Sequence, residues 1–201
     1  DQLEHFLLGN SYVIRLTTDT GITGIGTSAC WGYPEAIERI ANVFKEYLIG
    51  QNPLRIEHHW QHLYRMAPFR GTALSGAISA VDIALHDIKG KHFQVPVWEL
   101  LGGNCRDKIR LHLLAGGPTP EKMYENAKAA VAEGFTAIKF DPLTGGFQNQ
   151  AQARLIQNAV DIVAAAREGA GLDVDLIVEV PRKLPPMVAV ALGEALIPFH
   201  L

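Results

Sequence analysis

The second half of the chain repeats one pattern, a short apolar segment followed by a stretch with helical periodicity. These segments are residues 109–114, 136–140 and 176–180, and they are mostly apolar. Parallel strands are joined by long crossovers and covered by helices, so their sequences are apolar throughout rather than alternating. The pattern therefore predicts a parallel sheet built from successive βα units.

The first half of the chain follows a different pattern. Residues 12–18 alternate as a strand, the turn Asp19-Thr20-Gly21 follows, and residues 22–28 return as a hairpin partner. A change of pattern after Gly102-Gly103 separates the two halves. We expect an α+β domain over residues 1–108 and the first βα units of a second domain over residues 109–201. Helical patterns in the first domain cover residues 34–48, 53–66 and 72–91.

The last of these helical stretches carries a narrow stripe of small residues. The stripe consists of Ala73, Ala77, Ala80 and Ala84, and it ends at Ile88. Because small side chains allow another backbone to approach closely, we expect this side of the helix to be buried.

Composition and charge exclude several classes of function. The net charge is −3 and no run of like charges occurs, which argues against binding to nucleic acid or to a membrane surface. No apolar segment is long enough to span a membrane, and no signal peptide is visible. Two cysteines are too few for a disulfide framework and fit a reducing compartment, so we expect a cytoplasmic protein.

Three ionisable residues stand at the carboxyl ends of predicted strands, where functional side chains of parallel βα proteins gather. Lys139 and Asp141 are two residues apart and therefore face the same side of their strand. Glu179 ends an apolar run, where an unpaired carboxylate is costly to desolvate. A metal ion would remove that cost, and so would a salt bridge to Lys139. The pattern alone leaves both interpretations open.

Residues 77–91, Ala-Ile-Ser-Ala-Val-Asp-Ile-Ala-Leu-His-Asp-Ile-Lys-Gly-Lys, resemble the signature helix of the mandelate racemase/muconate lactonizing enzyme family, part of the enolase superfamily. The match continues through Pro96-Val97 to Gly102. The opening hairpin resembles the capping domain of this family, and residues 134–140 and 175–180 resemble its second and third barrel strands. The resemblance implies an α+β capping domain followed by a (β/α) TIM-type barrel.

The resemblance also implies a chemistry, in which Mg²⁺ holds the carboxylate of a small sugar acid while a proton is removed next to it. Glu179 occupies the first metal-ligand position, and Lys139 is the first lysine of the family's Lys-x-Lys element. Asp141 replaces the second lysine, which favours a sugar-acid dehydratase over a racemase. We therefore assign Lys139 and Asp141 to catalysis and Glu179 to the metal.

Two further residues are candidates for contact with the substrate. Trp31 falls where the family's capping loop covers the substrate, and Arg182 could meet a substrate carboxylate. The alternative interpretations are ordinary packing for Trp31 and a solvent-exposed loop position for Arg182. Pro181 stands where related dehydratases carry a histidine that acts as an acid or base, and proline cannot transfer a proton.

A (β/α)₈ barrel takes about 250 residues, so we expect this barrel to be incomplete and the chain to be a piece of a longer protein. The resemblance implies a metal-dependent lyase or racemase, and we expect the chain as given to lack most of the active site. The leading hypothesis is a dehydratase-like enzyme that forms homo-oligomers and is inactive as this fragment. The alternatives are a racemase or epimerase of the same family, or a catalytically dead module that folds or binds a partner.

Overall fold

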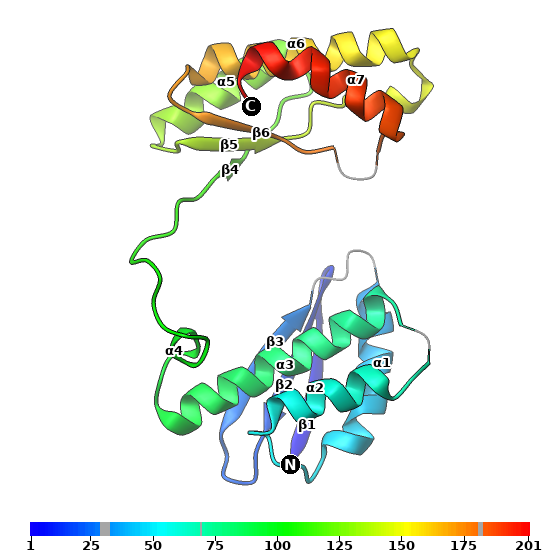
Figure 1. Cartoon of the computed structure of the whole chain (residues 1–201), viewed down its shortest axis with the longest axis vertical. Coiled ribbons are helices and arrows are strands. Elements are labelled where there is room, and N and C mark those ends of the chain that lie inside the picture. Colours follow the sequence, from blue (N-terminus) through cyan, green and yellow to red (C-terminus); the bar gives the residue numbers. More distant parts are fainter. Residues whose placement is uncertain (29–32, 69, 181–182) are drawn as a thin grey trace. The chain divides into compact units, whose positions relative to one another are not determined.

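The computed structural model describes residues 1–28, 33–68, 70–180 and 183–201. The chain divides into two compact units, Asp1–Asp107 (unit 1) and Lys108–Leu201 (unit 2), which Figure 1 draws by element. Each unit has its own cluster of buried hydrophobic residues. Among the helices of the described residues, none has the length and apolar character needed to cross a membrane.

Unit 1 contains a three-stranded antiparallel sheet in the order β1-β2-β3. The predicted hairpin is present as β2 (Ser11–Thr17) and β3 (Thr23–Ser28). The first strand, β1 (Gln2–Leu8), was not predicted. Its sequence lacks clean alternation, because Phe6, Leu7 and Leu8 are consecutive apolar residues and all three are exposed.

Four helices accompany this sheet: α1 (Pro34–Leu48), α2 (Ile56–Arg65), α3 (Thr72–Phe93) and the short α4 (Val97–Leu100). Ala77, Ala80 and Ala84 of α3 are buried, as predicted, whereas Ala73 is only half-buried, and β3 lies against the helix. A Cβ atom added at Gly26 of β3 would overlap the carbonyl oxygen of Ala80, and one at Gly24 would overlap that of Ala84. The two backbones therefore pack directly on each other, which explains the stripe.

Unit 2 contains a parallel three-stranded sheet in the order β4-β5-β6, as predicted. Figure 1 shows its helices on one face of the sheet. Ile138, Phe140 and Leu176 point to that face and form the core with the helices. The elements are β4 (Leu113–Leu114), α5 (Pro120–Ala132), β5 (Ala137–Phe140), the 3₁₀ turn η1 (Phe147–Asn149), α6 (Gln152–Ala170), β6 (Asp175–Val178), α7 (Pro186–Leu196) and the 3₁₀ turn η2 (Ile197–Phe199).

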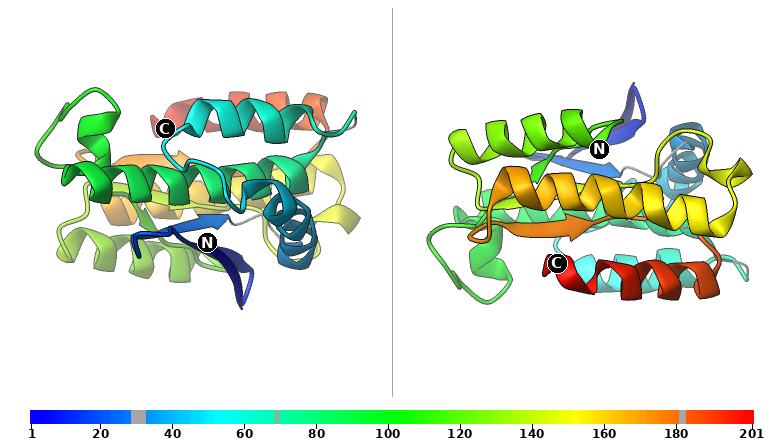
Figure 2. Two further views of the ribbon diagram at one scale, coloured as in Figure 1. Left: turned by 90° about the horizontal axis from the view of Figure 1, so that it is seen from below. Right: turned by 90° about the horizontal axis from the view of Figure 1, so that it is seen from above.

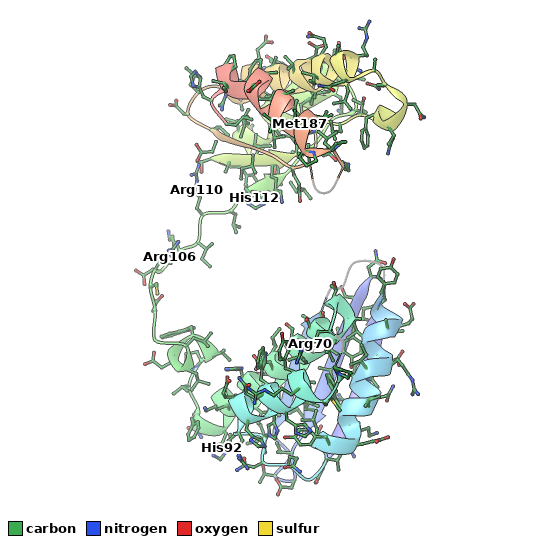
Figure 3. All side chains as sticks on the ribbon, turned by 45° about the vertical axis from the view of Figure 1, so that its right-hand side comes forward. Arg70, His92, Arg106, Arg110, His112 and Met187 are labelled. Carbon is green, nitrogen blue, oxygen red and sulfur yellow. The ribbon has the colours of Figure 1, made fainter. Side chains whose placement is uncertain are left out.

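The predicted first strand of unit 2, residues 109–114, is longer than the strand in the structure. Only Leu113 and Leu114 pair with β5. Arg110, labelled in Figure 3, instead donates hydrogen bonds to the Thr136 hydroxyl at 2.8 Å and to the Asp175 carboxylate at 2.6 Å. The segment before β4 is thus held through a side chain rather than through strand pairing.

Candidate active site

The candidate site lies at the carboxyl end of the parallel sheet of unit 2. In β5, Ile138 and Phe140 face the helices, so Lys139 points to the opposite face. The parallel register places Lys139 beside Ile177 of β6. Glu179 follows β6, and its backbone N–H donates to the Phe140 carbonyl at 2.9 Å, which extends the pairing by one step. Lys139 and Glu179 therefore project from neighbouring strands on the same face.

Lys139 and Glu179 form an ion pair with Nζ and Oε2 2.8 Å apart. This salt bridge is one of the two interpretations that the sequence left open for Glu179. The side chains of Lys139 and Glu179 are 27% and 38% exposed to solvent, respectively. Ion pairs exposed to this degree contribute about 1 kcal/mol or less. Glu179 can therefore exchange Lys139 for another cation at little cost, so the observed pair is compatible with a role as metal ligand.

Asp141 is engaged at both carboxylate oxygens. Its Oδ1 accepts a hydrogen bond from the Leu143 backbone N–H at 2.9 Å, and its Oδ2 forms an ion pair with Lys183. The Lys183 ammonium also lies 5.8 Å from the centre of the Phe147 ring. These contacts join the loop after β5 to the loop after β6.

Lys183 was not among the site residues predicted from the sequence. It comes from a loop with no recognisable motif, and the available signal was only its position shortly after the third strand, where functional side chains gather. Trp31, Pro181 and Arg182 lie outside the residues that the structure describes. Their predicted roles therefore remain sequence-based predictions.

The carboxylates of Asp141 and Glu179 do not form a complete metal site by themselves. Within residues 1–28, 33–68, 70–180 and 183–201, no group of three or more His, Cys, Asp or Glu side chains is arranged to hold a metal ion. Glu179 offers oxygen ligands of the type that Mg²⁺ prefers, but a single carboxylate does not satisfy its octahedral coordination. A magnesium ion at Glu179 would need further ligands beyond the described set.

Unit 1 contains a second cluster of titratable side chains, between α2 and α3. His86 Nδ1 lies 3.2 Å from the Asp82 carboxylate, which is one helical turn away on α3. Burial raises the pKa of Asp82, and the neighbouring His86 opposes that shift. His59 is buried, with its ring nitrogens hydrogen-bonded to the Tyr47 hydroxyl and the Asn52 carbonyl. Packing and local hydrogen bonds account for all of these groups.

A small antiparallel sheet packed on a long helix, followed by helix-covered parallel strands, is the architecture of enolase-superfamily proteins. A member of that superfamily from Salmonella Typhimurium superposes with a TM-score of 0.88 at 29% identity, over 95% of this chain and 55% of that one. The family profile described as "Mandelate racemase / muconate lactonizing enzyme, N-terminal domain" matches residues 9–102. Residues 9–102 thus match the N-terminal domain of the mandelate racemase/muconate lactonizing enzyme family, as the resemblance predicted.

Curated relatives narrow the comparison further. A D-galactonate dehydratase of Klebsiella pneumoniae (strain 342) is 34% identical over 191 residues, which cover 93% of this chain and 49% of the relative. The chain therefore spans about half the length of the curated relatives it matches. An enolase from Agrobacterium radiobacter, whose crystal structure contains Na and L-malate, superposes with a TM-score of 0.89 at 28% identity, over 99% of this chain and 52% of that one.

Proposed function

We propose that this chain provides the capping domain (residues 1–108) and the first βα units (residues 109–201) of a magnesium-dependent sugar-acid dehydratase. The observation that carries the proposal is the 34% identity to a D-galactonate dehydratase along 93% of the chain. The position of Lys139 and Glu179 at the carboxyl ends of neighbouring strands supports it. A cytoplasmic location and a homo-oligomeric assembly belong to the same proposal.

The proposed reaction removes a proton from the carbon next to the substrate carboxylate and expels the hydroxyl group of the adjacent carbon as water. The product is a 2-keto-3-deoxy acid. Lys139 and Asp141 are the proposed acid–base groups, Glu179 is the proposed metal ligand, and Trp31 and Arg182 are proposed to contact the substrate. Such proton transfers require a side chain within hydrogen-bond reach of the reacting atom.

The geometry ranks the two acid–base candidates. In the described residues, Asp141 has both oxygens engaged, by the Leu143 N–H and by Lys183. Lys139 contacts Glu179 through one ammonium hydrogen-bond donor and has three such donors in all. Proton transfer through Lys139 therefore needs less rearrangement than transfer through Asp141, and we assign the larger catalytic effect to Lys139.

The test is a chimera that joins residues 1–201 to the part of the Klebsiella enzyme that this chain does not span. Assayed with D-galactonate, the chimera carrying Pro181→His should form 2-keto acid. Lys139→Met should then lower kcat by about 10²–10⁴-fold. Lys122→Met is the matched control, because Lys122 is an exposed lysine on α5 that pairs only with the nearby Glu125 among the described residues, and it should leave the rate unchanged.

Two outcomes would contradict the dehydratase proposal. One is a chimera with a cooperative thermal transition that forms no 2-keto acid. The other is a chimera that epimerises the substrate without losing water, which would favour the racemase alternative. Equal losses in Lys139→Met and Lys122→Met would contradict the assignment of Lys139.

Magnesium should bind the 201-residue chain only weakly, with a dissociation constant of about 1 mM or higher, because a single carboxylate cannot replace a full ligand set. Isothermal titration calorimetry should show that Glu179→Ala removes even this binding. Glu168→Ala, which removes an exposed carboxylate on α6, is the control and should leave it intact. Tight, stoichiometric binding that survives Glu179→Ala would show that the metal site lies elsewhere.

A further inference from the structure

The two edge strands of the antiparallel sheet in unit 1, β1 and β3, differ in whether their outward backbone groups are hydrogen-bonded. At the β3 edge, the backbone N–H of Ile25 donates to the Asp87 carboxylate at 3.0 Å, and the Thr23 carbonyl accepts from Lys91 Nζ at 2.8 Å. Asp87 and Lys91 lie one turn apart on α3 and also pair with each other. These side chains occupy the backbone groups that another strand would need, so α3 closes this edge.

The register of the sheet determines which backbone groups of β1 point away from it. Thr18 donates its N–H to the Ile22 carbonyl, so the even-numbered residues of β2 point their backbone groups toward β3. The odd-numbered residues of β2 then point toward β1, where they pair with even-numbered residues such as Glu4 and Phe6. The remaining residues of β1, Leu3, His5 and Leu7, must direct their N–H and C=O groups away from the sheet.

Nothing in the described part of the chain closes this second edge. No hydrogen bond from a described residue reaches the outward backbone groups of Leu3, His5 or Leu7. Figure 2 shows β1, in dark blue, at the margin of the sheet. Its pairing with β2 is continuous and therefore has no bulge, and the strand contains neither proline nor lysine, two of the usual devices that block edge pairing. Its charged residue, Glu4, forms an ion pair with Arg15 of the neighbouring strand β2. Phe6, Leu7 and Leu8 are exposed along it.

We propose that β1 pairs antiparallel with β1 of a second copy of this chain, which makes one six-stranded sheet across a two-fold axis. An antiparallel edge is self-complementary under such an axis, because each copy offers the same outward N–H and C=O groups. This interface would serve the homo-oligomer proposed above and is independent of the catalytic assignment.

Side-chain chemistry selects the register. Pairing Glu4 with its own copy would place like charges directly opposite each other, which is unfavourable. Pairing His5 with its own copy would place Phe6 opposite Glu4, so the two Phe6 rings would not pair. Pairing Phe6 with Phe6 sets His5 opposite Leu7 and Glu4 opposite Leu8, and it is the register that joins the two Phe6 rings, at a non-hydrogen-bonded position where side chains approach most closely. The proposed two-fold axis therefore passes between the two Phe6 side chains.

Disulfide trapping tests the interface and its register in the full 201-residue chain, with Cys30 and Cys105 replaced by serine. Under mild oxidation, Phe6→Cys should form a disulfide-linked dimer at least about tenfold more efficiently than Leu8→Cys. The two Leu8 positions would lie about 14 Å apart along the strands, beyond disulfide reach. Leu8 is the stricter control because its side chain is 64% exposed, against 41% for Phe6, so random collisions would favour it.

Sedimentation equilibrium provides the second measurement. Phe6→Lys sets two like charges at the axis and should weaken dimerisation at least about tenfold. Ile25→Lys places the same charge on the same sheet face, at the closed β3 edge, and should not change it. A monomeric chain, equal trapping at Phe6 and Leu8, or association without trapping at Phe6 would each overturn the proposal. The last result would point to the edges of the parallel sheet, β4 and β6.

Discussion

No measurable dehydration of any sugar acid is expected from a polypeptide of these 201 residues alone. In the proposed mechanism a bound metal would stabilise the charge that develops next to the carboxylate, and Glu179, its proposed ligand, supplies one carboxylate rather than a complete set among the described residues. Loss of a general acid or base typically lowers the rate by about 10²–10⁴-fold, and Pro181 stands where the histidine would be. Loss of the metal site adds to this, so the combined effect should abolish activity.

The measurement is an assay for 2-keto acid with a panel of sugar acids and Mg²⁺. Pro181→His should not rescue the 201-residue chain, whereas the same substitution should raise the activity of the chimera with the Klebsiella enzyme. The contrast separates the effect of Pro181 from that of the missing ligands. Magnesium-dependent product from the 201-residue chain, lost in Lys139→Ala, would show that the catalytic groups have been misplaced.

Gly26→Ala is expected to lower the free energy of unfolding of unit 1 by more than about 3 kcal/mol. The added methyl group would overlap the backbone carbonyl of Ala80 on α3, and a backbone atom cannot move aside as a flexible side chain can. Strand β3 would have to separate from α3 along much of its length. Urea denaturation followed by tryptophan fluorescence reports this directly, because Trp31, Trp60 and Trp98 all belong to unit 1.

The matched control for this prediction is Gly71→Ala. Gly71 precedes α3 with an extended backbone, and a Cβ atom there would meet no heavy atom within 4 Å. Because Gly71 is the N-cap of α3, where alanine is less favourable than glycine, its substitution should lower the free energy of unfolding by about 1 kcal/mol or less. Similar losses in both variants would show that the close approach of β3 to α3 does not limit stability.

Much of the fold could be predicted because local patterns specify local structure. The hairpin turn, the helical periodicity and the apolar strands of unit 2 each correspond to an element in the structure. The small residues of α3 predicted a close backbone approach, and Gly24 and Gly26 supply it. The extent of β4 was not predictable, because it depends on which residues lie beside β5 and on the contacts of Arg110.

The sequence by itself determined that Lys139 and Asp141 share one side of their strand, because strand alternation has a fixed period of two. It also determined that Glu179 stands at the end of a neighbouring apolar segment. Only the tertiary structure decided that Lys139 pairs with Glu179 while Asp141 pairs with Lys183. These partners depend on the register between β5 and β6 and on the path of the loop after β6. Both are set by packing between segments far apart in the sequence, which no local pattern encodes.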